Sequence, residues 1–232
     1  MGWQKWTAGA VAVEPSIYAA DFARLGAQLE ALLAAGARVF HFDVGDGHFI
    51  SEITIGPVVL RSIADLVHAS GGVLDCHLMV SEPERHFESV KASGGDSVTF
   101  HVEAVDDPQR AAAHARELGL GVGVAFNPET AVEAAAAAAE AAEADLVLCM
   151  SIHPGLSGQV LLAEAPARIG QLRALVSDTV LLQVDGGISA ANVRELRAAG
   201  ADLLVAGSAV FWQEDPGVAF RALSAIVQEV GA

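Results

Sequence analysis

Short apolar runs alternate with longer segments of helical periodicity along almost the whole chain. The runs are continuously apolar, so both faces of each predicted strand are expected to be covered by other elements. Eight strands are predicted, at Val11–Ile17, Arg38–Asp43, Val73–Val80, Ser97–Glu103, Gly121–Phe126, Asp145–Ile152, Val180–Asp185 and Asp202–Ala206. Eight helices are predicted between and after them, at Ala20–Ala35, Pro57–Val67, Pro83–Ala92, Pro108–Leu118, Ala131–Ala144, Glu164–Val176, Ala190–Ala199 and Pro216–Val230.

Eight strand–helix pairs in a chain of 232 residues favour a single-domain (β/α)8 TIM barrel, with a doubly wound open sheet as the alternative. No linker-like segment interrupts the alternation. Residues 1–232 are therefore expected to form one domain, in which residues 1–10 are a short N-terminal extension. Enzymes with this barrel carry their active sites at the carboxyl ends of the strands, so these ends are where functional residues are expected.

Composition and charge exclude several classes of function. Although 53% of the residues are hydrophobic, no apolar run is long enough to cross a bilayer, and the first residues lack the apolar core of a secretory signal. Cys76 and Cys149 lie inside apolar runs, which indicates buried free thiols and a cytoplasmic protein. The formal net charge of −16 makes nucleic acids and anionic membranes poor partners.

Four residues of metal-ligand type stand at the ends of predicted strands. His41 and Asp43 are two residues apart on one strand and therefore share a face, while His77 and Asp185 close two other strands. Each residue alone has an ordinary structural explanation, such as a hydrogen-bonded strand end or a turn. Together at one barrel mouth, two imidazoles and two carboxylates predict a site for zinc, iron(II), manganese or cobalt.

Glycine-rich loops follow three consecutive strands, at residues 155–158, 186–187 and 207–208. The loops after the last strands of this barrel commonly bind phosphate through backbone N–H groups. Ordinary turn chemistry explains any one of them, but three at the same rim favour a phosphate site. The pattern also allows His48, His101 and His153 to lie at the rim.

Several segments taken in order resemble the ribulose-phosphate 3-epimerase family. They are Pro15-Ser16-Ile17, His41-Phe42-Asp43-Val44-Gly45-Asp46-Gly47-His48-Phe49, His77-Leu78-Met79-Val80, Pro154-Gly155 with Gly158-Gln159, Val184-Asp185-Gly186-Gly187-Ile188 and Ala206-Gly207-Ser208-Ala209. The resemblance runs from about Val13 to Asp215, which is nearly the whole chain.

The resemblance implies an isomerase that interconverts D-ribulose 5-phosphate and D-xylulose 5-phosphate by two-base proton transfer through a metal-stabilised enediolate. It implies one divalent metal ion, zinc first and iron(II), manganese or cobalt as alternatives, and a homo-oligomer whose ligand is a small-molecule ketose phosphate. The implied metal ligands are His41, Asp43, His77 and Asp185, and the implied acid/base pair is Asp43 and Asp185. The implied substrate contacts are Ser16, His48, Met79, Met150, Gly155, Leu156, Ser157, Gly158, Gly186, Gly187, Gly207 and Ser208.

Two alternatives stay open at this point. Gly45 stands where the family usually has a methionine, and Ser157 replaces a glycine of the phosphate region. The space expected at Gly45 would suit a longer ketose phosphate, such as D-allulose 6-phosphate. The second alternative is a non-catalytic barrel that binds a phosphorylated ligand.

Overall fold

The computed structural model describes residues 12–155 and 158–230. The N-terminal extension expected over residues 1–10, and the expected substrate contacts Leu156 and Ser157, lie outside these ranges. Among the described residues, no helix is both long and apolar enough to span a membrane.

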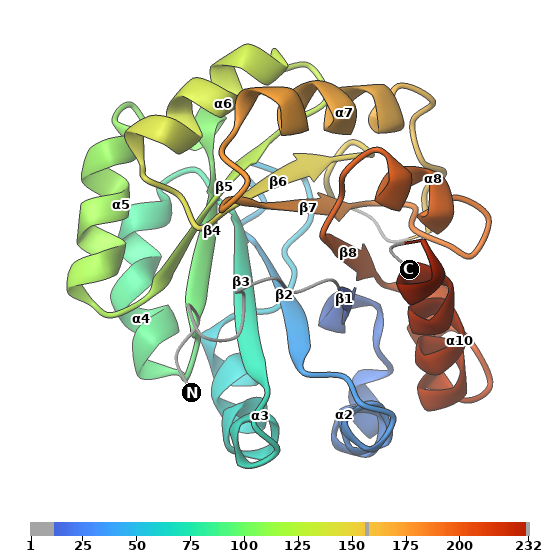
Figure 1. Cartoon of the computed structure of the whole chain (residues 1–232). Coiled ribbons are helices and arrows are strands. Elements are labelled where there is room, and N and C mark those ends of the chain that lie inside the picture. The colour runs from blue at the N-terminus through green and yellow to red at the C-terminus, as the bar shows by residue number, and fades with distance from the viewer. Residues whose placement is uncertain (1–11, 156–157, 231–232) are drawn as a thin grey trace.

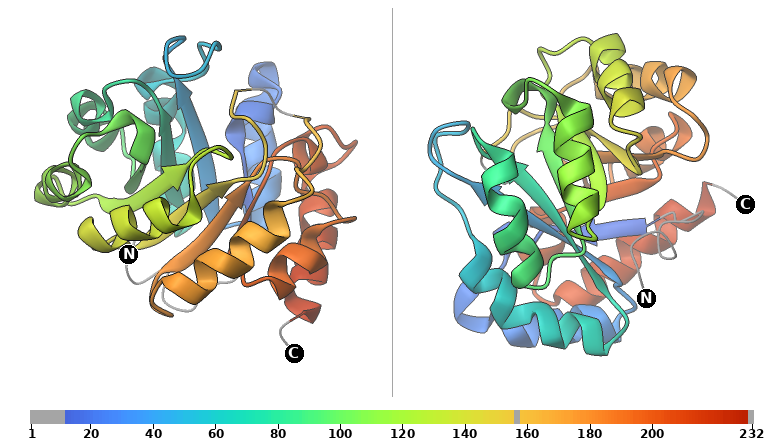
Figure 2. Two further views of the ribbon diagram at one scale, coloured as in Figure 1. Left: turned by 90° about the horizontal axis from the view of Figure 1, so that it is seen from above. Right: turned by 90° about the vertical axis from the view of Figure 1, so that its left-hand side faces the viewer.

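Eight parallel strands form one sheet that curls into a barrel, as Figures 1 and 2 show. The strands are β1 (Ala12–Pro15), β2 (Val39–Gly45), β3 (Val73–Met79), β4 (Ser97–His101), β5 (Gly121–Phe126), β6 (Leu146–Met150), β7 (Leu181–Asp185) and β8 (Leu203–Ala206). β1 pairs with β8, and a parallel bridge between Ser16 and His41 joins β1 to β2. The predicted (β/α)8 barrel is confirmed, and the doubly wound alternative was wrong.

Helices cover the outside of the barrel (Figure 1). They are α2 (Leu25–Ala34), α3 (Pro57–Ala69), α4 (Phe87–Ala92), α5 (Pro108–Glu117), α6 (Val132–Ala141), α7 (Ala165–Leu175), α8 (Val193–Ala198), α9 (Ser208–Phe211) and α10 (Pro216–Glu229). Proline begins several of them, where its missing N–H costs no helical hydrogen bond. Asp107 and Asp215 cap α5 and α10 by accepting hydrogen bonds from backbone N–H groups of the first turn.

Several predicted elements were too long, and local hydrogen bonds explain two of these differences. The helix expected from Ala20 begins only at Leu25, because Asp21 accepts the N–H of Ala23 and starts the 3₁₀ turn η2 (Phe22–Arg24) first. The strand expected to reach Glu103 ends at His101, and the 3₁₀ turn η4 (Val102–Ala104) follows it. This turn brings the Glu103 carboxylate back to the His101 ring.

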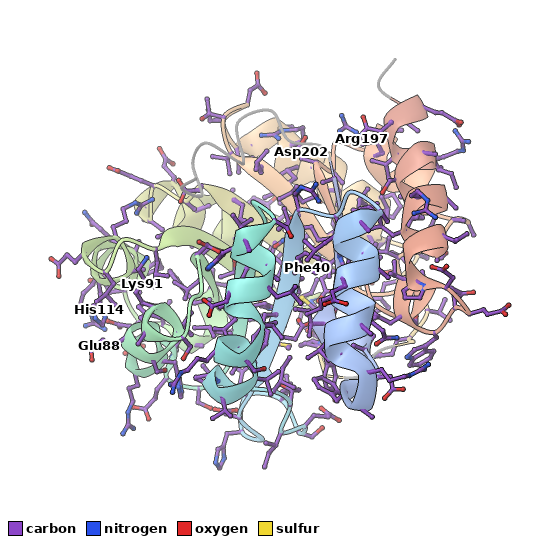
Figure 3. All side chains as sticks on the ribbon, turned by 90° about the horizontal axis from the view of Figure 1, so that it is seen from below. Phe40, Glu88, Lys91, His114, Arg197 and Asp202 are labelled. Carbon is purple, nitrogen blue, oxygen red and sulfur yellow. The ribbon has the colours of Figure 1, made fainter. Side chains whose placement is uncertain are left out.

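The alternation of side chains along each strand divides the core into two parts. Phe40 and Phe42 of β2 belong to the large apolar cluster between strands and helices, and Figure 3 shows Phe40 between α2 and α3. Val39 of the same strand joins Leu148 and Met150 in a smaller cluster inside the barrel. His41 and Asp43 have the same parity as Val39, so the sheet itself directs them into the barrel.

At the amino-terminal end of the barrel, Asp202 joins two helices to the start of a strand. Asp202 accepts the backbone N–H of Leu182 and pairs with Arg173 and Arg197 at 3.4 and 3.6 Å (Figure 3). These partners are partly buried and tie α7 and α8 to the start of β8. This end of the barrel therefore serves stability, as is usual for the fold.

Candidate active site at the carboxyl end of the barrel

The four expected metal ligands converge at the carboxyl end of the strands. One ligand-type atom from each of His41, Asp43, His77 and Asp185 lies within 4.8 Å of all the others. Asp43 Oδ1 is 3.2 Å from both His41 Nε2 and His77 Nδ1, and Asp185 Oδ2 is 3.9 Å from His77 Nδ1. Three strands thus bring these four residues together, although His41 and Asp185 are 144 positions apart in the sequence (185 − 41).

The orientation of His41 leaves one ring nitrogen available at that point. Its Nδ1 lies 3.1 Å from Asp75 Oδ2, which fixes the ring. Its Nε2 approaches Asp43 without the alignment of a hydrogen bond and has no such partner among the described residues. A fully buried nitrogen without a hydrogen bond is costly unless another ligand satisfies it.

The donor set fits a divalent transition metal. Two imidazole nitrogens and two carboxylate groups suit zinc and its borderline neighbours, whereas calcium and magnesium prefer all-oxygen sites. The orphaned His41 Nε2 and the His77 Nδ1 both face the carboxylates that would complete such a site. The residues therefore satisfy the expectation of one bound cation, and they do not distinguish among zinc, iron(II), manganese and cobalt.

The two carboxyl groups of the site lie in opposite electrostatic environments. Burial opposes the charge of Asp43, but the adjacent His41 and His77 lower its pKa below the usual value. Burial, followed by the charge of Asp43, raises the pKa of Asp185 to about 7. Without a cation, Asp43 is therefore held as a carboxylate while Asp185 titrates near neutral pH. A bound cation would lower both pKa values.

A second polar layer lies beneath these residues, inside the barrel. Gln183 Nε2 donates to Glu14 Oε2 at 2.6 Å and to Asp75 Oδ2 at 2.7 Å, and Ser97 donates to Asp75 Oδ1 at 2.6 Å. All four side chains are fully buried. The layer holds Asp75 in place, and Asp75 in turn holds His41.

Glu14 makes the stability of this buried layer dependent on pH. Burial and the nearby Asp75 raise its pKa to about 8. In the folded chain Glu14 therefore keeps its proton up to about pH 8, whereas in the unfolded chain it loses the proton near its usual value of 4.5. Between pH 4.5 and about pH 8 the unfolded chain therefore binds fewer protons than the folded chain. The stability that protonated Glu14 contributes is consequently lost as pH rises through this range.

Glu14→Gln is expected to stabilise the fold increasingly as pH rises. Between about pH 5.5 and about pH 8, the advantage of the variant in unfolding free energy should widen by on the order of 3 kcal/mol, because glutamine cannot ionise. Guanidinium unfolding with a chelator present measures it. Glu140→Gln, at an exposed position, is the control. If the difference in unfolding free energy between Glu14→Gln and the unmodified chain stayed constant across this pH range, Glu14 would not be uncharged in the folded protein.

Most of the expected substrate contacts line one cleft above the cluster. The cleft has a volume of about 510 Å³ including its open mouth. The expected residues that line it are Ser16, Asp43, Met79, Met150, Gly155, Gly158, Asp185, Gly186, Gly187, Gly207 and Ser208. Ser16 Oγ also donates to Asp43 Oδ2 at 2.6 Å. His41 and His77 lie fully buried below the cleft, and His48 is exposed and does not line it.

The glycine loops approach one another more closely than larger residues would permit. Gly187 has a φ of +68°, and a Cβ there would lie 2.5 Å from the backbone nitrogen of Leu161. The loop after β6 therefore packs directly on the loop after β7. Among the residues that the structure describes, none that lines the cleft is a lysine or an arginine, so an anion bound to these residues would depend on backbone N–H groups and hydroxyls.

Comparison with known proteins agrees with this geometry. Residues 12–211 match the model of the Ribulose-phosphate 3 epimerase family. The chain is 38% identical over 206 residues to the ribulose-phosphate 3-epimerase of Escherichia coli (strain K12), covering 88% of this chain and 90% of that protein. It is 39% identical over 214 residues to the ribulose-phosphate 3-epimerase of Mycobacterium leprae (strain TN), and the match covers 91% of this chain and 92% of that protein. The chain belongs to the ribulose-phosphate 3-epimerase family.

This member of the epimerase family is therefore an isomerase. Solved structures of other proteins share its barrel at lower sequence identity. The 3-hexulose-6-phosphate synthase from Salmonella typhimurium superimposes with a TM-score of 0.71 at 18% identity, covering 94% of this chain and 99% of that one. The KGPDC structure from Streptococcus mutans has the same TM-score at 11% identity, and the match covers 96% of this chain and 100% of that one. At these identities the likeness concerns the fold alone.

Sequence reasoning missed several residues of the epimerase site. Tyr18, Ile152, Pro154, Ile188 and Val205 also line the cleft. Tyr18 directly follows one of the quoted motifs, and Pro154 and Ile188 lie within two others, so proximity in sequence was an available signal.

Two missed residues lie behind the candidate metal ligands. Asp75 shares the inward parity of His77, two residues along the same strand, and contacts His41. His101 was expected only as a rim residue, but it is fully buried and its Nε2 lies 2.8 Å from His77 Nε2. Burial lowers the pKa of His101 to about 4, which leaves the ring neutral. No spacing rule connects β4 to this contact, which depends on the neighbouring strand register.

Proposed function

We propose that this enzyme interconverts D-ribulose 5-phosphate and D-xylulose 5-phosphate with one bound divalent metal ion, zinc in the first instance. The observation that supports this most directly is the placement of Asp43 and Asp185. They come from β2 and β7, both line the cleft, and both belong to the same cluster as His41 and His77. A ligand-binding barrel without catalysis has no need for two converging carboxyl groups.

The proton transfers are assigned to the two aspartates. Epimerisation at C3 removes the proton next to the ketone and returns one to the opposite face, so one carboxylate accepts while the other carboxylic acid donates. Asp43 and Asp185 exchange these roles between the two directions. Ser16 donates a hydrogen bond to Asp43 Oδ2, which orients that carboxylate toward the cleft.

The cation is assigned to His41 Nε2, His77 Nδ1 and the two aspartates. When bound, a divalent cation supplies a Lewis acid for the negative charge that develops on the substrate oxygens. The buried histidines hold their lone pairs toward this position without access to water. The substrate phosphate is assigned to the loops that carry Gly187 and Ser208, which flank the open end of the cleft.

The structure does not favour the longer ketose phosphate. A Cβ built on Gly45 would lie 2.5 Å from Ile50 Cδ1 and 2.9 Å from the carbonyl oxygen of Glu52. The expectation that Gly45 opens space was therefore wrong, because the loop after β2 folds the buried Ile50 into that volume. Gly45 pairs in register with Met79, which lines the cleft, so we place Ile50 behind that wall of the cleft.

Ile50→Ala is expected to widen substrate preference. Removing the side chain reopens the space at Gly45, and the ratio of kcat/KM for D-allulose 6-phosphate to that for D-ribulose 5-phosphate should rise about 10-fold. Steady-state kinetics on both sugars measure it. Ile53→Ala, in the same loop with its side chain exposed, is the matched control. An unchanged ratio for Ile50→Ala would show that Ile50 does not limit the length of the substrate.

Turnover and isotope exchange together test the proposed activity. Each zinc-, iron(II)-, manganese- and cobalt-loaded sample is incubated with D-ribulose 5-phosphate in heavy water. We expect D-xylulose 5-phosphate to form with deuterium at C3. Absence of both product and exchange with all four metals would favour the non-catalytic binder, and a strong preference for D-allulose 6-phosphate would replace the assigned substrate.

The cytoplasmic location and the homo-oligomer are further parts of the proposal. The location is supported by Cys76 and Cys149, which are free and buried. The oligomer rests on the family resemblance, and light scattering after size-exclusion chromatography tests it.

A further inference from the structure

We propose that Glu103 and His101 are positioning residues that fix the tautomer of His77, so that its Nδ1 lone pair faces the cation. This inference rests on the metal site of the proposed function. It assigns a role to two residues that belong neither to the ligand set nor to the cleft.

The three side chains form a continuous hydrogen-bonded series. His77 Nε2 lies 2.8 Å from His101 Nε2, and His101 Nδ1 lies 3.2 Å from Glu103 Oε2. Both rings are fully buried. The Phe49 ring packs over His101 with its centroid 4.7 Å away. Water therefore has little access to the nitrogens, and the protein partners decide where the protons lie.

Glu103 decides which side chain donates and which accepts in each hydrogen bond of the series. Its Oε1 accepts the backbone N–H of Asn127 at 2.8 Å and the hydroxyl of Thr130, so the group acts as an acceptor. Its Oε2 then accepts from His101 Nδ1–H. A neutral imidazole carries one N–H, so His101 Nε2 must accept from His77 Nε2–H. The proton of His77 is thereby held on Nε2, and the lone pair stays on Nδ1.

The anchor of the series is itself fixed to the scaffold. Arg168 of α7 donates to the carbonyl oxygens of Asn127 and Thr130 at 3.1 and 3.0 Å, and its guanidinium lies 5.0 Å from the centre of the Phe126 ring. The loop after β5 therefore presents its N–H and hydroxyl to Glu103 in a set geometry. The two histidines of the site are thus held by separate carboxylates, His41 directly by Asp75 and His77 through His101 by Glu103.

The first test is the protonation pattern of the unmodified chain. Asp43 Oδ1 lies 3.2 Å from His77 Nδ1 and would favour a proton there in metal-free protein, so the measurement uses the zinc-loaded chain. Nitrogen-15 NMR of the imidazoles should show His77 protonated on Nε2, and His101 protonated on Nδ1 and unprotonated on Nε2. A proton on His101 Nε2 would overturn the inference. This measurement needs no variant and reads the tautomer directly.

The second test is metal affinity of Glu103→Gln. The glutamine oxygen is required by Asn127 and Thr130, so its NH₂ faces His101 Nδ1 and forces the opposite direction, with a proton on His77 Nδ1. Dissociation constants for Zn²⁺ and Co²⁺, from competition with a chromophoric chelator, should rise about 10–100-fold. Glu82→Gln removes an exposed carboxylate that pairs with the nearby Arg85; it is the matched control and should bind like the unmodified chain.

The outcomes separate this inference from the function on which it rests. Unchanged affinity in a folded Glu103→Gln variant would overturn the positioning role while leaving the metal site intact. If the unmodified chain binds neither cation, the proposed metal site fails, whichever tautomer His77 adopts. If Glu103→Gln does not fold, the nitrogen-15 pattern of the unmodified chain decides alone.

Discussion

Replacing Asp185 by asparagine is expected to reduce epimerase turnover by at least about 10³-fold. Asparagine has the same shape but can neither accept nor donate the C3 proton, a contribution worth about 10²–10⁴-fold. The change also removes a carboxylate from the four-residue cluster. The variant should keep its fold, because Asp185 lies at the end of β7, where its side chain is not part of the apolar core. Formation of D-xylulose 5-phosphate and deuterium exchange at C3 measure the loss.

Asp178→Asn is the control for Asp185→Asn, since this exposed residue lies in the loop before the same strand. It should retain full activity. Turnover by Asp185→Asn within a few-fold of the unmodified enzyme would refute the role assigned to Asp185. If Asp185→Asn still exchanged deuterium at C3 but formed no product, the first proton transfer would be assigned to Asp43 alone.

Removal of the metal is expected to lower turnover by a similar factor of at least about 10³. Without the cation, no positive group on the cleft lining offsets the negative charge that develops on the substrate beside Asp43 and Asp185. The described residues that line the cleft include no lysine or arginine. Protein treated with a chelator and freed of it should regain activity with zinc, iron(II), manganese or cobalt. Coupled kinetic assays, with circular dichroism to verify the fold, measure this.

Calcium serves as the control cation, because it prefers six to eight oxygen ligands and two of the four groups here are imidazoles. It should not restore activity. Full turnover by protein shown by elemental analysis to be metal-free would contradict the metal requirement. Equal restoration by calcium would place the cation at a site other than His41 and His77.

Strand periodicity predicted the convergence of the four ligand-type residues, and it did so for a simple physical reason. Two residues at positions i and i+2 of a strand point the same way, so His41 and Asp43 had to share a face, and a barrel gathers the carboxyl ends of all its strands. His77 and Asp185 then followed from their positions at strand ends. The same parity would have shown that Asp75 and Glu14 point inward, but neither was singled out, because isolated carboxylates are rarely buried.

The remaining features depend on contacts that sequence spacing does not encode. The space at Gly45 is filled by Ile50 because the loop after β2 turns back on its own strand, and the sequence alone gave no sign of this path. The contact between His77 and His101 depends on the register between β3 and β4. His48 belongs to the same motif as Asp43, yet it lies exposed outside the cleft, and its contact with substrate stays a prediction.

A crystal structure of the zinc-loaded enzyme, with anomalous scattering recorded at the zinc edge, is the most direct test of the metal centre. We expect one anomalous peak within about 2.0–2.2 Å of His41 Nε2, His77 Nδ1 and an oxygen of each of Asp43 and Asp185. A fully occupied peak away from these four side chains, or none after saturation with zinc, would contradict it.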